Sequence, residues 1–212
     1  MTEPAAGTGP PGTDLVRAAS EFLHRHSTPL LVHHSHRVYA WAVLLGRVRG
    51  IDVDRELLHV AAAFHDVGLL PGHRSDTERF EIDGADAARA FLDEQGVATD
   101  RSDVVWQAIA LHTTPEVPRR LRPEIALLQA GVEYDVMGRD FDTLGSDDRA
   151  AVLAEHPRDG FADGIVRAFH DGFVFKPAST FGTMNADVLA RLSPGTEPGS
   201  FVDAIHAAPF GP

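Results

Sequence analysis

The sequence predicts an all-α protein that folds as a single helical bundle. Apolar side chains recur at three- and four-residue spacing through most of the chain, as they do on one face of a helix. No stretch shows the alternation of apolar and polar residues that is typical of a strand, and we find no internal repeat. The 212 residues, of which 43% are hydrophobic, suit one domain with a sizeable core.

Capping and helix-breaking residues divide this domain into successive helices. Thr13 and Asp54 are suited to cap helix starts, and Pro123 lies at a favoured first-turn position. Pro29 and Gly50 are expected to end the first and second helices. The expected helices cover about residues 14–28, 34–48, 55–70, a segment ending at 96, 103–111, 123–138, 146–155, 160–169 and a short segment ending at 192.

The two ends of the chain lie outside the predicted domain, which we place at residues 13–192. Residues 1–12 are rich in Pro, Gly, Ala and Thr and are expected to be disordered. Residues 193–212 are expected to form a loose C-terminal tail. An apolar patch from Phe201 to Phe210 in this tail is a candidate contact surface for a homo-oligomer.

Composition limits the expected partners and compartment. The chain has no cysteine, which excludes a disulfide framework and any thiolate metal site. Its formal net charge of −12, without a basic stripe, disfavours nucleic acid as a partner. We see neither a signal-peptide pattern nor an apolar stretch long enough to span a membrane. We therefore expect a cytoplasmic protein, without a membrane partner, that acts on a small-molecule substrate.

Polar residues lie in line with the apolar stripes of several expected helices. The stripe of the second helix, which includes Val38 and Trp41, extends back one turn to His34. His33 and His36 fall on other faces, toward solvent or the rim of the site, and His36 is a candidate for lining the entrance. Periodicity therefore selects His34 as the inward histidine of this cluster.

Three other helices carry polar residues at comparable positions. The third ends in the pair His65-Asp66, the stripe of the fifth reaches His112, and that of the sixth reaches Asp135. Buried polar side chains cost free energy unless a partner holds them, and a divalent metal is such a partner. Imidazoles and carboxylates without cysteine suit Zn²⁺, Mn²⁺ or Fe²⁺. The sequence therefore predicts a metal site.

These residues resemble the signature of the HD-domain superfamily of metal-dependent hydrolases, which consists of a histidine, a His-Asp pair and an aspartate in that order along the chain. His34, His65-Asp66 and Asp135 match it in order. The resemblance spans about residues 30–189 and is closer to the cyanamide hydratase branch. Four segments are similar to that branch: 34–39, 80–85, 108–113 and 176–182.

The resemblance implies an all-helical HD fold that holds one divalent metal, expected to be zinc, with Fe²⁺ or Mn²⁺ as alternatives. His34, His65, Asp66 and Asp135 would be its ligands. The implied reaction is addition of water across the C≡N bond of a small nitrile such as cyanamide, giving urea. Asp66 would also orient the attacking water, and His112 would move a proton to the developing imide nitrogen.

Four further residues are candidates for the pocket around the metal. Glu81 and Thr113 lie in or next to segments that resemble the hydratase branch. Arg37 lies in the segment 34–39 and could pair with a carboxylate near the site. His36 is the candidate for the entrance.

An HD-type phosphohydrolase, acting on a small phosphorylated or nucleotide substrate, is one alternative function. HD phosphohydrolases often carry a lysine shortly after the His-Asp pair, and this chain has none in that segment. A phosphate substrate needs positive charge, which Arg37, Arg74 and Arg79 could supply.

Two more alternatives concern the metal count and the role of the fold. Two-metal HD enzymes, including di-iron oxygenases, resemble one another in an extra histidine ahead of a Gly-Ala pair. Here the matching residue is Phe80, whose ring cannot bind a metal, although His73 or Glu81 could substitute. A metal-containing regulatory or ligand-binding HD module is the non-enzyme alternative, because a fold does not fix a function.

Overall fold

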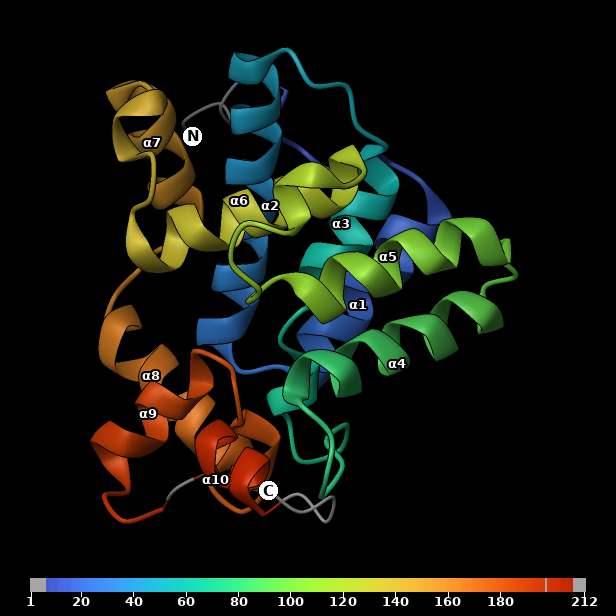
Figure 1. The fold of residues 1–212 in the computed structure, drawn as a ribbon. Helices are drawn as coiled ribbons and strands as arrows, with labels where there is room; N and C mark the ends of the chain where they lie inside the picture. The colour runs from blue at the N-terminus through green and yellow to red at the C-terminus, as the bar shows by residue number, and fades with distance from the viewer. Residues whose placement is uncertain (1–6, 197, 208–212) are drawn as a thin grey trace.

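The predicted all-α fold is confirmed by the computed structural model, which describes residues 7–196 and 198–207. Residues 1–6, in the predicted disordered segment, and 208–212, at the end of the predicted apolar patch, lie outside the described residues. Among the described residues there are ten α-helices and four short 3-10 helices, and no strand (Figure 1). The α-helices are α1 (Asp14–His26), α2 (Pro29–Arg49), α3 (Arg55–Phe64), α4 (Phe80–Glu94), α5 (Thr99–Leu111), α6 (Pro123–Met137), α7 (Ser146–Glu155), α8 (Phe161–Phe173), α9 (Asn185–Leu192) and α10 (Phe201–His206). The 3-10 helices are η1 (Val67–Leu69), η2 (Pro118–Arg120), η3 (Phe141–Thr143) and η4 (Pro177–Thr180).

Several helix ends differ from the sequence prediction. Pro29 begins α2 instead of ending the helix before it, because the Thr28 hydroxyl caps the new helix and a proline is well placed in a first turn. The helix α3 ends at Phe64, earlier than predicted, and the chain continues into η1. The segment expected to be a loose tail contains α10.

The main core is built from the first six helices. The most extensive packing is between α2 and α6, and between α4 and α5, which lie side by side in Figure 1. Gly131 on α6 allows the first of these contacts, because a Cβ atom there would clash with the carbonyl oxygen of Val38 on α2. One turn beyond this crossing, α6 brings Asp135 next to α2.

A second close backbone approach lies directly after the His65-Asp66 pair. A Cβ atom on Gly68 would clash with the carbonyl oxygen of Phe80, so η1 packs directly against the start of α4. A Cβ atom on Gly84 would lie 3.0 Å from the carbonyl oxygen of Phe64. These two glycines hold the end of α3 against α4, which buries both members of the pair.

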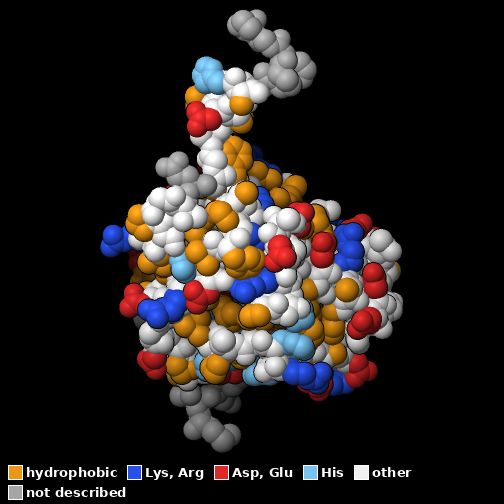
Figure 2. Space-filling view, turned by 90° about the horizontal axis from the view of Figure 1, so that it is seen from below, with side chains coloured by type: hydrophobic (Ala, Val, Ile, Leu, Met, Phe, Trp, Pro, Cys, Tyr) orange, Lys and Arg blue, Asp and Glu red, His pale blue; other side chains and the backbone are white. Residues whose placement is uncertain are grey.

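The C-terminal helices α8 and α9 form a second layer at one end of the core (Figure 1). Lys176, only 3% exposed, ties this layer to α4 through Nζ, which lies 2.6 Å from Oδ2 of Asp83 and 3.0 Å from the carbonyl oxygen of Ser75. The last helix, α10, projects from the body in the view of Figure 2. Among the described residues, no helix combines the length and the apolar character needed to cross a membrane.

His59 on α3 makes the stability of the fold sensitive to acid. Its side chain is buried, and Nε2 lies 2.9 Å from the Ser20 hydroxyl. Burial, with a smaller effect of His36, lowers the pKa of His59 from 6.5 to about 4. Between these values the unfolded chain binds a proton that the folded chain does not, so the free energy of unfolding decreases as the pH falls. At pH 5 the loss from this histidine is about 2 kcal/mol.

We expect His59→Gln to reduce the loss of unfolding free energy between neutral pH and pH 5 by about 2 kcal/mol, the share that His59 contributes. Urea unfolding at neutral pH and at about pH 5 measures it directly. His206→Gln is the matched control, because His206 is exposed on α10 and its replacement should leave the wild-type difference unchanged. An equal loss in wild type and His59→Gln would show that the acid sensitivity arises elsewhere.

Candidate metal centre

Three buried side chains from two neighbouring helices converge on one point. His34 lies on α2, whereas His65 and Asp66 directly follow α3. Nε2 of His34 lies 3.1 Å from Nε2 of His65, and Oδ2 of Asp66 lies 3.5 Å from the former and 3.3 Å from the latter. In the described part of the chain, this is the one group of three or more metal-ligating side chains close enough to share an ion.

Hydrogen bonds on the far side of each imidazole fix how it faces this point. Nδ1 of His65 donates to the carbonyl oxygen of Ala62 at 2.8 Å, and Nδ1 of His34 donates to Oδ2 of Asp135 at 2.7 Å. Each ring therefore carries its proton on Nδ1 and directs the Nε2 lone pair inward. A carbonyl or carboxylate behind a ligating histidine is the usual way in which proteins orient such a ligand.

The carboxylate of Asp66 supplies the test of whether a metal fits. Both of its oxygens are buried without a hydrogen-bond partner, which is costly for a charged group. Burial favours the neutral acid, but the neighbouring His65 and His34 outweigh it and hold the pKa of Asp66 below its usual range. Ligand atoms around a tetrahedral Zn²⁺ with bonds of about 2.0–2.1 Å lie about 3.3 Å apart, close to the observed distances. The donor set therefore fits a divalent metal.

Asp135, the predicted fourth ligand, lies outside this group of three. Besides the bond from His34, its oxygens accept bonds from Arg37 Nε at 2.8 Å, Arg37 Nη2 at 2.9 Å and Trp41 Nε1 at 2.8 Å. These donors, acting with His34 against the effect of burial, hold the pKa of Asp135 below its usual range. To bind a metal, this carboxylate would have to leave Arg37 and Trp41. The geometry gives it the position of a group that orients His34.

His112, at the end of α5, stands beside the group of three. Its Nε2 lies 3.8 Å from Oδ1 of Asp66, and its Nδ1 donates to the carbonyl oxygen of Ile109 at 2.6 Å. Burial, together with the nearby His65, lowers the pKa of His112 to about 4. The ring is therefore neutral near pH 7, with Nε2 able to accept a proton.

A cavity of about 300 Å³ opens onto these residues. His34, Asp66 and His112 form its polar end together with Thr113. The remaining lining is mostly apolar and comes from α6, α8 and the start of α9. Its other lining residues are Val132, Glu133, Val136, Met137, Phe169, Met184, Asn185, Asp187 and Val188. None of the cavity's lining residues is lysine or arginine.

Glu81 does not line the cavity but holds two residues that do. Its carboxylate is buried and accepts hydrogen bonds from the Thr113 hydroxyl, from Asn185 Nδ2 at 3.0 Å and from Arg79 Nη2 at 3.1 Å. Burial opposes ionisation, but the bonds from Arg79 and the nearby His112 lower the pKa of Glu81. Glu81 is therefore an ionised anchor behind the cavity wall.

Two other predicted pocket residues lie elsewhere. Arg37 is 1% exposed and is engaged by Asp135 and by the carbonyl oxygen of Pro157, 2.7 Å from Nη1. His36 faces away from the cavity. Its ring stacks on that of His156, and its Nε2 lies 3.5 Å from Nε2 of His24. Neither side chain lines the cavity, since both point from α2 toward other neighbours.

The residues considered as candidate ligands for a second metal make other contacts. The Phe80 ring meets the His112 ring edge-on, with ring centroids 5.6 Å apart. His73 lies 3.3 Å from His26, between Nε2 and Nδ1, and packs near Phe22 on α1. Glu81 is bonded to the cavity wall. His73 and Glu81, the two candidate ligands for a second metal, therefore contact separate parts of the protein.

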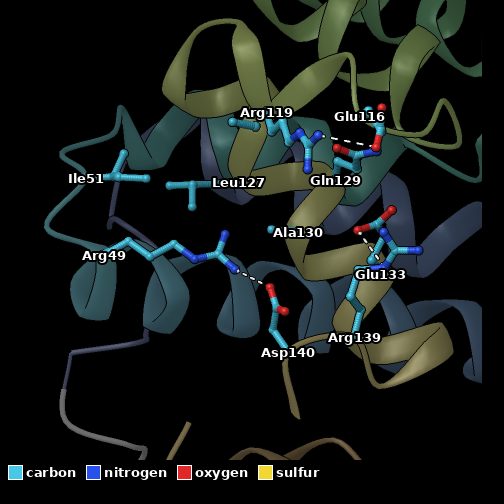
Figure 3. A pocket seen from close by; sticks show the side chains of 11 residues that line it. Arg49, Ile51, Glu116, Arg119, Leu127, Gln129, Ala130, Glu133, Arg139 and Asp140 are labelled. Atoms are coloured by element: carbon cyan, nitrogen blue, oxygen red, sulfur yellow. Dashed lines mark hydrogen bonds and ion pairs between the residues drawn. The ribbon is translucent and has the colours of Figure 1, made fainter. Parts of the chain in front are cut away.

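The arginines weighed for phosphate binding are also engaged. Arg74 donates to the carbonyl oxygen of Asp171 at 2.8 Å, and Arg79 pairs with Glu81. A separate surface pocket contains three arginines, but each is paired with an acid (Figure 3). The pairs are Arg49 with Asp140, Arg119 with Glu116 and Arg139 with Glu133. The charges of this pocket therefore cancel pair by pair.

Asn185 and most of the cavity wall were not predicted from the sequence. Asn185 begins α9, where no stripe of the main core extends to it, and its approach to Glu81 depends on how α9 packs. The one available signal was the nearby segment 176–182, which resembles the hydratase branch but does not include Asn185.

Comparison with known proteins identifies a family and two relatives. The HD domain family model matches residues 31–136, half of the chain, a range that holds His34, His65-Asp66 and Asp135. The cyanamide hydratases DDI2 and DDI3 of Saccharomyces cerevisiae are each 26% identical to this chain over 159 residues, which cover 73% of this chain and 71% of each relative. These matches support a metal-dependent hydrolase or hydratase. The chain belongs to the HD domain family, and within that family its sequence is similar to the cyanamide hydratases.

Proposed function

We propose that this protein is a metal-dependent hydratase that adds water to a small neutral nitrile such as cyanamide, giving urea. The observation that carries the proposal is the unpartnered Asp66 carboxylate, which lies beside two oriented histidines at the end of a cavity without lysine or arginine. A cavity whose lining has no lysine or arginine suits a neutral substrate better than a phosphate ester. The names of the two yeast relatives support the nitrile in particular.

His34, His65 and Asp66 are the proposed metal ligands, and Zn²⁺ is the proposed metal because it favours few imidazole and carboxylate ligands. Bound there, such a metal would lower the pKa of a water molecule and polarise the nitrile nitrogen. Asp135 is proposed to orient His34, with Arg37 and Trp41 holding the carboxylate in place.

His112 is the proposed proton carrier. Its neutral ring presents the Nε2 lone pair beside Asp66, where it can accept a proton from the attacking water. The same nitrogen can then deliver that proton to the former nitrile nitrogen. The bond from Nδ1 to the carbonyl oxygen of Ile109 keeps the ring in one orientation through both transfers.

Asn185 and Thr113 are proposed to position the substrate. Asn185 donates its amide N–H to Glu81, which leaves the amide oxygen available to accept an N–H group from the substrate. The Thr113 hydroxyl likewise donates to Glu81, so its oxygen can accept another hydrogen bond. The amino group of cyanamide offers N–H donors of this kind.

Urea production tests the proposal. The purified chain, reconstituted with Zn²⁺, is given cyanamide, and urea is quantified against a metal-free sample. We expect metal-dependent urea formation. Turnover of phosphate esters without nitrile hydration would favour the phosphohydrolase alternative, and bound metal without turnover of a panel of nitriles, isonitriles and phosphate esters would favour the non-enzyme module.

We expect His112→Gln to lower kcat by about 10²–10⁴-fold, the usual contribution of a general acid–base group, while the metal content stays unchanged. Steady-state kinetics with metal analysis of the same sample separates the two effects. His59→Gln is the matched control at neutral pH, because His59 is a buried histidine outside the cavity lining. If the kcat of His112→Gln matches wild type, the proton must be carried by another group.

A further inference from the structure

We propose that the preferred substrates carry a compact, neutral, apolar substituent, as in N-alkyl cyanamides. This inference rests on the proposed nitrile hydration and specifies its substrate class. It draws on three properties of the cavity: its volume, the apolar character of the wall that faces the metal end, and the sign of its charges.

The cavity is larger than cyanamide requires. Its volume is about 300 Å³, whereas a cavity of roughly 10–15 Å³ on such a measure already admits a water molecule. Cyanamide has only three non-hydrogen atoms. Bound with its nitrile at the Asp66 end, it would leave most of the volume unfilled. A substituent on the amino nitrogen would extend into this space.

Apolar residues from α6, α8 and α9 line that space. Val132 and Val136 lie on the same face of α6, and Val188 projects from α9. Phe169 of α8 completes this wall, and Met184 lies closer to solvent, with 41% of its surface exposed. Burying methylene groups against such a wall stabilises the complex, provided that the contacts persist in the transition state.

The charges of the wall select against an anionic substituent. Besides Asp66, the lining of the cavity includes two acidic residues, Glu133 and Asp187, and no lysine or arginine. The charge of Glu133 is balanced by Arg139, whose Nε lies 3.4 Å from the Glu133 carboxylate in the surface pocket of Figure 3. A carboxylate on the substrate would therefore find no lysine or arginine in the lining to pair with, while Asp66 and Asp187 carry charges of the same sign.

The reaction on such a substrate balances with water alone. For R–NH–C≡N, a C–O bond forms from the water oxygen, and both C–N π bonds of the nitrile are lost as the oxygen becomes a carbonyl. The two protons of water move to the former nitrile nitrogen. The product is the N-alkyl urea R–NH–CO–NH₂, without an oxidant, a reductant or a leaving group.

The test compares kcat/KM for cyanamide and its N-methyl, N-ethyl and N-propyl derivatives. We expect a rise of about fourfold for each buried methylene. N-isobutylcyanamide and N-carboxymethylcyanamide form a matched pair of similar shape, and we expect the anionic member to react at least about tenfold more slowly. If cyanamide is hydrated but kcat/KM falls steadily along the alkyl series, or the matched pair reacts equally well, the inference is overturned. If no nitrile is hydrated, the proposed function itself fails, and the inference fails with it.

Filling the cavity tests the same wall from the protein side. Val136→Phe should lower the ratio of kcat/KM for N-isobutylcyanamide to that for cyanamide by at least about tenfold. Val188→Phe makes the same test from α9 if the first variant does not fold. The ratio compares two substrates on one protein sample, so a partial loss of metal or of folded protein cancels. An unchanged ratio in a folded variant would place the substituent elsewhere and overturn the inference.

Discussion

Asp66→Asn is expected to reduce kcat/KM for cyanamide by at least about a thousandfold, because metal catalysis contributes several kcal/mol of transition-state stabilisation. The amide removes the anionic ligand but keeps the size of the side chain. We expect the purified variant to contain little metal, whereas wild type retains it. Steady-state kinetics and metal analysis on the same samples measure both effects.

The melting temperature of this variant shows whether Asp66 binds the metal or only stabilises the fold. A metal that binds only the folded chain raises its stability, so a chelator should lower the melting temperature of wild type and leave that of Asp66→Asn unchanged. Asp163→Asn is the control, because Asp163 is an exposed carboxylate on α8 outside the cavity lining. Equal chelator sensitivity of wild type and Asp66→Asn would show that Asp66 is not a ligand.

Asp135→Asn is expected to lower the free energy of unfolding by about 3–5 kcal/mol, the usual cost of removing one partner from a buried ion pair. Arg37 would keep a charge that is 1% exposed and has lost its carboxylate. The bond that orients His34 would also weaken, so metal affinity should fall by about 10–100-fold. Urea unfolding of the metal-free protein measures the first effect, and metal titration measures the second.

The exposed pair of Arg49 and Asp140 provides the matched control, because Asp140→Asn should cost only about 0–1 kcal/mol. The double variant Arg37→Met/Asp135→Leu removes both buried charges, so it should recover much of the lost stability without restoring metal affinity. A complete loss of metal binding in Asp135→Asn, with stability unchanged, would instead support the predicted ligand role of Asp135.

Helical periodicity predicted which residues face inward but not what each one meets there. The stripes of α2, α5 and α6 correctly selected His34, His112 and Asp135 as buried residues. Periodicity predicts which face of a helix a residue lies on. Whether that residue binds a metal depends on its distance from side chains on other helices. The sequence suggested that Arg37 could pair with a carboxylate near the site, and the structure identifies that carboxylate as Asp135, both of whose oxygens accept bonds from Arg37.

The cavity wall could not be predicted because it depends on how the last helices pack. Met184 directly precedes α9, and Asn185 and Val188 lie on α9, which packs mainly against α8 and η4. The sequence around Pro29 was likewise insufficient to predict a helix boundary. A proline can follow the end of one helix or begin the next, and the Thr28 cap shows that Pro29 begins α2. Patterns within one helix were informative, whereas contacts between distant segments required the structure.

Anomalous diffraction from crystals of the Zn²⁺-loaded protein, collected on both sides of the zinc absorption edge, tests the central claim most directly. The account predicts one peak per chain within bonding distance of His34 Nε2, His65 Nε2 and an Asp66 oxygen, with distances of about 2.0–2.2 Å. A protein that takes up no metal after reconstitution, or a peak bound by other side chains, would contradict it.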